Sequence, residues 1–232
     1  MKIVGITGSP RKGSNTDIIV DRVLEGAASK GADIEKICIS DLNISYCTGC
    51  IECRQTGICR LTKEGQDDDL PRVIDLLAGA DGMVLGSPVY GGYIPGRFKN
   101  MFDRFASQLI ITPGPDGPQY QCRIPGKRNS IVIATCGSPL GSMTQPTLEF
   151  LKRTAFLYGN GGQVISEISV HGLMIPAQII ADKQTLSGFA ANFNIPDPVV
   201  DKMIEQYRST MEQAYRDGER LASLEVPGVP MN

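Results

Sequence analysis

The sequence has no tryptophan and a single histidine, His171, and neither sign of charge dominates it. One histidine leaves little room for Ser-His-Asp or Cys-His hydrolytic chemistry, and no nucleophile motif accompanies it. The formal net charge of −2 offers no basic surface to a phosphate backbone, so nucleic-acid binding is not expected. These shortages argue against the common hydrolase and nucleic-acid-binding designs.

Long apolar runs are also missing, because no stretch reaches the roughly eighteen residues that indicate a membrane span. The first residues lead directly into a strand pattern without the features of a signal peptide. We therefore expect a cytoplasmic protein with no membrane partner. Its seven cysteines, an odd number, are then better explained by reduced thiols for metal, cluster or redox chemistry than by structural disulfides.

Strand and helix patterns alternate along most of the chain. Short apolar runs predict strands at residues 3–7, 34–39, 82–85, 130–134 and 163–170. Apolar residues at helical spacing predict helices at residues 16–28, 70–77, 98–109, 145–158 and 197–221. Residues 112–127, rich in proline and glycine, are expected to form an insertion loop. Residues 176–191 give no clear pattern.

This alternation predicts an α/β fold with helices on both faces of a parallel sheet. Five such strands match the flavodoxin-like, doubly wound sheet with the order 2-1-3-4-5. The length of 232 residues fits one large domain with a C-terminal helical extension.

The loop after the first strand, residues 8–16, has the composition of an anion-binding site. In an open parallel sheet this loop presents backbone N–H groups and a helix amino terminus to a ligand. The side chains that add to it are those of Ser9, Arg11, Ser14, Asn15 and Thr16, while Gly13 allows close approach. A phosphate monoester fits this loop, whereas a Walker lysine and the G-x-G-x-x-G pattern are both absent. A polar turn that only caps a helix is the alternative.

The same loop, with the sequence GSPRKGSNT, resembles the FMN phosphate loop of the NAD(P)H-dependent FMN reductase and iron-sulfur flavoprotein group. A second match is SPVYGGYIPG at residues 87–96, which in that group runs along the isoalloxazine ring. The resemblance places Pro88, Val89 and Tyr90 beside the ring. The backbone N–H groups of Gly91 and Gly92 would then hydrogen-bond to it.

A weaker match follows the fourth predicted strand, at residues 135–142, where the group has its third flavin loop. It implies that Thr135 and Gly137 also contact FMN, with a plain turn as the alternative. Cys136 in this loop and Cys38 on the second predicted strand are expected to have packing roles.

Four cysteines lie in one loop after the second predicted strand, with the spacing C-x2-C-x2-C-x5-C: Cys47, Cys50, Cys53 and Cys59. Thiolates so close in sequence can converge on one centre, and they select zinc or an iron-sulfur cluster. The motif resembles that of the iron-sulfur flavoproteins, which implies a 4Fe-4S cluster held by these four residues. Zinc, a disulfide-capable thiol set and inert cysteines are the alternatives. The acidic run at residues 67–69 is expected to be a solvated helix start.

The resemblance implies an FMN-binding domain over residues 1–172, including a cysteine-rich loop at residues 44–66. Residues 173–232 would be a C-terminal extension that packs on this domain or on a partner subunit. A homodimer or homotetramer is expected.

With FMN and a cluster, the protein would transfer electrons between a one-electron carrier such as ferredoxin and an acceptor that the sequence does not identify. The flavin, rather than a catalytic side chain, would carry the chemistry. One alternative is a cluster-free FMN or quinone reductase that uses NAD(P)H as its substrate. The other is a non-enzymatic FMN module with structural zinc.

Overall fold

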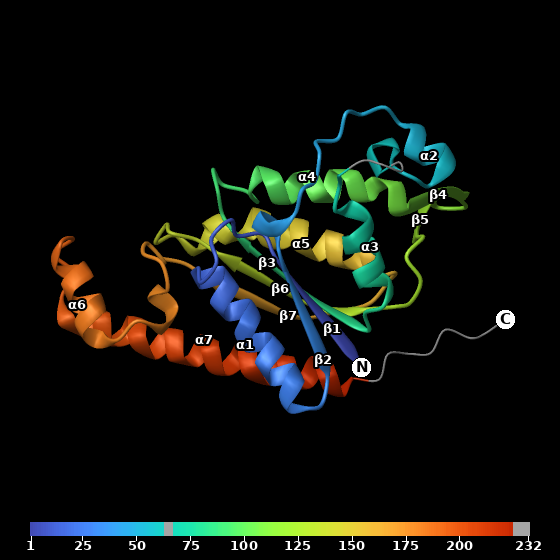
Figure 1. Ribbon diagram of the computed structural model, residues 1–232. Coiled ribbons are helices and arrows are strands. Elements are labelled where there is room, and N and C mark those ends of the chain that lie inside the picture. Colours follow the sequence, from blue (N-terminus) through green and yellow to red (C-terminus); the bar gives the residue numbers. More distant parts are fainter. Residues whose placement is uncertain (63–66, 225–232) are drawn as a thin grey trace.

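The computed structural model describes residues 1–62 and 67–224. The ends of two predicted segments, residues 63–66 of the cysteine-rich loop and residues 225–232 of the extension, lie outside the described residues. Five parallel strands form one sheet in the order β2-β1-β3-β6-β7 (Figure 1). Counted along this sheet alone, the order is 2-1-3-4-5, so the predicted flavodoxin-like topology is confirmed.

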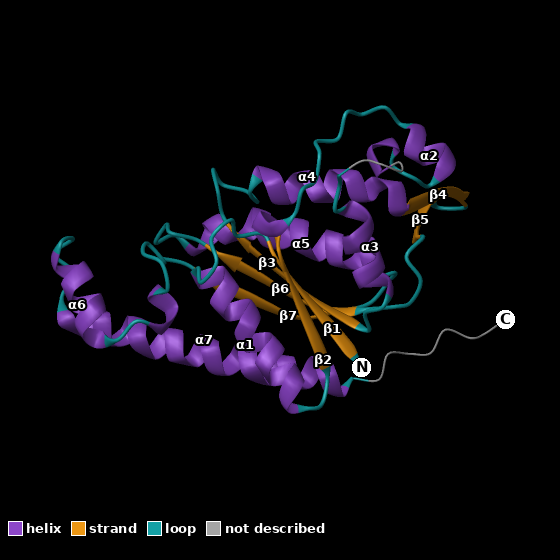
Figure 2. Cartoon of the chain, in the orientation of Figure 1, coloured by secondary structure: helices purple, strands orange, loops and turns teal. Residues whose placement is uncertain are grey.

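The elements alternate as the sequence patterns indicate (Figure 2). The sheet strands are β1 (Lys2–Thr7), β2 (Asp33–Cys38), β3 (Gly82–Pro88), β6 (Asn129–Thr135) and β7 (Val164–Val170). The α-helices are α1 (Asn15–Ser29), α2 (Glu52–Thr56), α3 (Leu70–Ala78), α4 (Gly96–Phe105), α5 (Gln145–Tyr158), α6 (Lys183–Ala191) and α7 (Asp197–Ser223). No helix in the described part of the chain is both long enough and apolar enough to cross a membrane.

Two apolar layers sandwich the sheet. Val4 and Ile6 of β1 pack with α3, α4 and α5, while Ile3 points to the opposite layer with α1 and α7. All residues of β3 and β6 are buried, as expected for central strands that helices cover on both faces. The alternation of side chains along each strand therefore divides the core into two halves.

The long terminal helix α7 lies directly against α1. A Cβ added at Gly218 would stand 1.9 Å from the carbonyl oxygen of Val23, and one added at Gly26 would stand 2.0 Å from the carbonyl oxygen of Tyr215. Glycine on both helices allows this close approach, because any larger side chain would collide with the facing backbone. The helix predicted at residues 197–221 is thus an integral layer of the fold.

Two predictions about the middle of the chain were wrong. The helix predicted to end at residue 109 ends at Phe105, and β4 (Leu109–Gly114) begins shortly afterwards. The predicted insertion loop is an antiparallel hairpin, in which β4 pairs with β5 (Gly117–Cys122). The sequence P-D-G at the hairpin tip supplies the tight turn, which the proline and glycine content had masked.

Candidate functional site

A cavity of about 350 Å³ opens at the carboxyl ends of β1, β3 and β6. Every predicted cofactor-binding residue lines it except Gly13, Gly91 and Gly92. Three loops that are far apart in sequence therefore meet at one place, as the rule for ligand sites in open parallel sheets requires.

The first of these loops is shaped by its own side chains. Ser14 is the N-cap of α1: its Oγ accepts a hydrogen bond from the backbone N–H of Asp17 and donates one to Ser9 Oγ at 2.8 Å. Gly13 has a φ of +66°, and its N–H donates to Asp17 Oδ2 at 2.8 Å. The amino terminus of α1 therefore faces the cavity with its first backbone N–H groups, and such a helix end is a site where anions bind.

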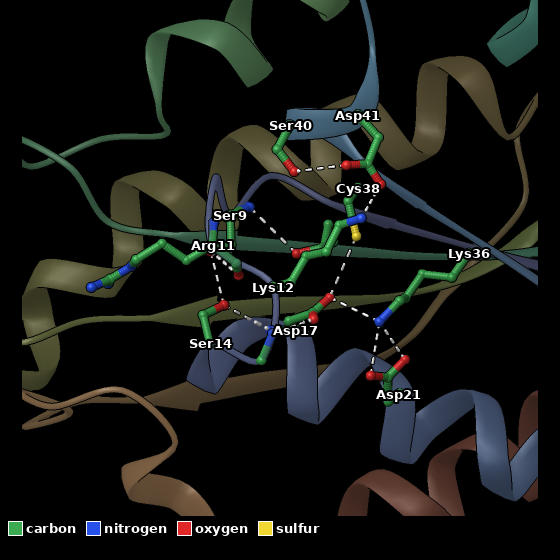
Figure 3. A network of polar contacts seen from close by, with 12 residues as sticks. Ser9, Arg11, Lys12, Ser14, Asp17, Asp21, Lys36, Cys38, Ser40 and Asp41 are labelled. Carbon is green, nitrogen blue, oxygen red and sulfur yellow. Dashed lines mark hydrogen bonds and ion pairs between the residues drawn. The ribbon is translucent and has the colours of Figure 1, made fainter.

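A polar network supports the loop from behind (Figure 3). Lys36 of β2 pairs with Asp17 at 2.9 Å and with Asp21 at 2.6 Å. Burial lowers the pKa of Lys36, but its hydrogen bonds to the two carboxylates outweigh burial and raise it. Cys38, buried as expected, points its Sγ at Asp17 Oδ1 from 3.8 Å. Burial is the main reason that the pKa of this thiol is raised.

Two cavity-lining residues of α1 use their side chains to bond to other segments of the chain. The hydroxyl of Thr16 lies 2.6 Å from the hydroxyl of Thr135, which joins the first loop to the third. The amide of Asn15, which the sequence suggested as a phosphate donor, instead donates to the carbonyl of Ile175 at 2.8 Å and accepts from the N–H of Ile179 at 2.9 Å. Asn15 thus lines the cavity while its side chain ties α1 to the segment after β7.

The second loop is a tight reversal of the chain. The backbone groups of Tyr90 and Tyr93 bond to each other in both directions, at 2.7 Å and 3.1 Å. Gly91 and Gly92 between them have φ values of +59° and +84°, which is the conformation of a two-residue turn that needs glycine. The conformation of the turn therefore explains why both positions are glycine, independently of the predicted hydrogen bonds to the flavin ring. Val89 links this loop to Thr135, whose carbonyl accepts its N–H at 2.8 Å.

Three residues of the cavity wall were not predicted as cofactor-binding residues: Cys136, Leu173 and Met174. Cys136 was expected to have a packing role, and it is buried. Leu173 and Met174 follow β7 and lie beyond the predicted domain boundary at residue 172. No motif marks them, because their place depends on how the extension folds back over α1.

The predicted metal ligands lie between β2 and α3, in the cysteine-rich loop, where Cys53 is part of the short helix α2. Cys47 and Cys50 are exposed, Cys53 and Cys59 are half-buried, and all four thiols are free. Burial is the main reason that the pKa of Cys53 is raised, and the other three thiols raise it further. Within residues 1–62 and 67–224, however, no three Cys, His, Asp or Glu side chains are grouped closely enough to hold a metal.

Helix α4 holds this loop in place. Asn100 accepts the N–H of Cys47 at 3.0 Å, and it donates to the carbonyls of Ile44 and Ser45. Arg104 donates to the carbonyl of Ser45 at 3.2 Å. No motif in the sequence pointed to the contacts of Asn100 or Arg104 with this loop.

The same arginine corrects one expectation about the acidic run. Arg104 pairs with Asp68, and the side chains of the two residues are 0% and 1% exposed. Asp68 is therefore a buried counter-ion rather than part of a solvated helix start. Arg104 also donates to Cys59 Sγ at 3.4 Å, so it joins the acidic run to the cysteine loop.

The chain is similar to known proteins both in sequence and in fold. The model of the family "NADPH-dependent FMN reductase" matches residues 1–123. The chain is 38% identical over 104 residues to an iron-sulfur flavoprotein of Methanosarcina thermophila, which covers 45% of this chain and 52% of that protein. It is 38% identical over 154 residues to an iron-sulfur flavoprotein of Archaeoglobus fulgidus, which covers 61% of this chain and 66% of that one.

The match to the Methanosarcina protein thus spans about half of that relative's length. Among solved structures, the fold is similar to that of an NAD(P)H:quinone oxidoreductase from Methanothermobacter marburgensis. The TM-score is 0.60 at 14% identity, over 97% of this chain and 98% of that one. At this low identity the likeness concerns the fold alone.

Proposed function

The chain belongs to the NADPH-dependent FMN reductase family, and on that premise we propose that it is an FMN-binding iron-sulfur flavoprotein. In this proposal it transfers electrons between a one-electron carrier such as ferredoxin and an acceptor whose identity is open. The observation that carries the proposal is the cavity in which the loops after β1, β3 and β6 meet.

The residues around the cavity fit FMN. Its volume of about 350 Å³ lies within the range of small-molecule sites. Ser9, Ser14 and Thr16 bring buried hydroxyls to the amino terminus of α1, which suits the phosphate group. Val89 and Tyr90 offer an apolar surface to the flavin ring, and Tyr90 is 43% exposed, so it remains available to a ligand.

The cysteine loop fits an iron-sulfur cluster by its donor chemistry. Four free thiols within one short loop provide the ligand set that such a cluster needs. We propose Cys47, Cys50, Cys53 and Cys59 as the ligands of a 4Fe-4S cluster, with Arg104 and the amide of Asn100 holding the loop. When bound, flavin exchanges electrons in pairs or singly, whereas a cluster exchanges them singly. Together they would couple a two-electron reaction partner to a one-electron partner.

A second candidate function is a cluster-free FMN or quinone reductase that uses NAD(P)H. It is favoured by the side chains of the cysteine loop, which in residues 47–62 are not grouped to hold a metal. In this case the nicotinamide would stack on the exposed face of the flavin, and Tyr90 at the rim would contact it. The two candidates share the FMN site and differ in the role of the cysteines.

The deciding experiment is an analysis of flavin, iron, sulfide and zinc in protein purified without oxygen. We expect FMN together with about four irons and four sulfides in each chain. Cys50→Ala should lose the iron and keep the FMN, whereas Cys122→Ala, outside the loop, should keep both. FMN without iron, reduced by NAD(P)H, would favour the second candidate; zinc in place of iron would indicate a structural metal. Absence of FMN would overturn the whole proposal.

A further inference from the structure

The segment between β7 and α6 forms one side of the cavity. Leu173 and Met174 line the cavity, and Met174 is 52% exposed. The segment continues through a short 3-10 helix, Gln178–Ile180, before α6 begins. We refer to residues 172–180 as the C-terminal wall. Except for residue 172, it is the first part of the predicted extension, for which the sequence indicated no role in the cofactor site.

One side chain organises this wall. Gln178 is completely buried, and both ends of its amide are used. Its Oε1 accepts the N–H groups of Met174 at 2.7 Å and Ile175 at 3.0 Å. Its Nε2 donates to the carbonyl of Gly172 at 2.9 Å and to the hydroxyl of Tyr207 at 2.7 Å. The amide therefore folds the wall around itself and fastens it to α7.

The wall is fastened at a second point to the start of α1. Asn15, the first residue of that helix, bonds through its amide to the backbone of Ile175 and of Ile179. Asn15 itself lines the cavity, one position after the N-cap Ser14. The same wall is thus tied on one side to the proposed phosphate loop and on the other to α7.

We propose that Gln178 and Tyr207 are positioning residues for FMN, which they hold indirectly by fixing the C-terminal wall against the cavity. The inference rests on the proposed FMN binding and deepens it, because it gives the C-terminal extension a part in the site. Binding of FMN and docking of the wall on α7 are then coupled, so each strengthens the other by the same factor. Neither side chain lines the cavity, so their effect passes through Leu173, Met174 and Asn15.

The test compares two buried tyrosines. Tyr207→Phe removes the hydroxyl that accepts from Gln178 and leaves a buried amide N–H without its partner. Tyr158→Phe is the matched control, because Tyr158 is also buried but bonds to the carbonyl of Phe102 in the other apolar layer. Flavin fluorescence quenching measures the Kd for FMN of each apoprotein, and thermal melting measures the stability of each apoprotein.

We expect Tyr207→Phe to weaken FMN binding about tenfold, which corresponds to roughly 1.4 kcal/mol. Tyr158→Phe should bind FMN as the unmodified protein does, even where its apoprotein melts at a lower temperature. A purely structural role for Tyr207 would lower the melting temperature and leave the Kd unchanged, and that result would overturn the inference.

A second measurement needs no variant. Hydrogen exchange of the unmodified protein should show that FMN slows the amides of Met174, Ile175 and Ile179, while the β4–β5 hairpin exchanges at the same rate. If FMN binds without slowing these amides, the inference fails and the proposed function stands. If FMN does not bind the unmodified protein, both fail together.

Discussion

Lys36 and Asp17 form an ion pair of 2.9 Å that joins the edge strand β2 to α1, the helix that follows the proposed phosphate loop. The side chain of Asp17 is only 5% exposed, and its second oxygen accepts the N–H of Gly13. A single carboxylate therefore receives a cation from β2 on one side and shapes the loop on the other. The position of Gly13 therefore depends, through Asp17, on Lys36, which lies outside the loop.

Lys36→Met should accordingly destabilise the protein and loosen the loop. It leaves the Asp17 carboxylate nearly buried without its cation, which costs about 2–4 kcal/mol. Urea unfolding should show this loss, and FMN should bind more weakly because the turn at Gly13 is less constrained. Lys183→Met is the control, since the Lys183–Asp201 pair is more than half exposed and should contribute nothing measurable. Equal unfolding curves for the two variants would contradict the prediction.

The buried pair between Arg104 and Asp68 should be more sensitive still. Asp68→Asn leaves a fully buried guanidinium without a counter-ion, so we expect a loss of about 3–5 kcal/mol in urea unfolding. Asp103→Asn breaks the exposed pair with Lys99 on the same helix and should cost no more than about 0.5 kcal/mol. A loss below about 1 kcal/mol in Asp68→Asn would indicate that water reaches Arg104.

Alkaline pH should destabilise the protein in part through Tyr158. Burial raises the pKa of Tyr158 well above its ordinary value of 10.0. The unfolded chain loses this proton first, so the stability that Tyr158 contributes is complete below about pH 10 and falls as the pH rises further. The midpoint of urea unfolding, measured from about pH 9 to about pH 11, should therefore fall less steeply in Tyr158→Phe. Tyr120→Phe, in the exposed hairpin, should keep the steepness of the unmodified protein.

The contact between α1 and α7 gives a further pair of variants. Gly218→Ala should destabilise the protein by about 1–3 kcal/mol, because the new methyl group would force the two helices apart. Gly188→Ala, on α6, meets open space and should stabilise the protein by up to about 1 kcal/mol through helix propensity. Thermal melting of both variants tests the contact, and a stabilised Gly218→Ala would refute it.

The sheet was predictable because its pattern is local. Each central strand is a continuous apolar run, and parallel strands joined by helices permit few arrangements. The β4–β5 hairpin was missed because its strands do not alternate between apolar and polar residues. In β5 only Cys122 is buried, so this strand has no apolar face that a sequence pattern could reveal. Residues 176–191 were ambiguous because α6 buries only Leu186 and Ala190, which makes its apolar pattern weak. Its N-cap is nevertheless regular, since Asp182 accepts the N–H of Thr185.

The site was predictable where it follows from strand ends and not where it depends on distant partners. The first two loops could be located because each begins at the carboxyl end of a strand. The burial of Asp68 could not be foreseen, since its partner Arg104 is 36 residues away on α4. The role of Asn15 depends on Ile175, which lies 160 residues further along the chain.

The separation of 160 residues between Asn15 and Ile175 also sets the time that passes between their synthesis. A ribosome adds about 5–20 residues each second, so roughly 10–30 s pass between the synthesis of Asn15 and that of Ile175. During this interval the amide of Asn15 has neither of its two backbone partners, although the strands from β1 to β6 are synthesised within it or before it. The parts of the cavity that come from the loops after β1, β3 and β6 are therefore synthesised before the side that the C-terminal wall forms.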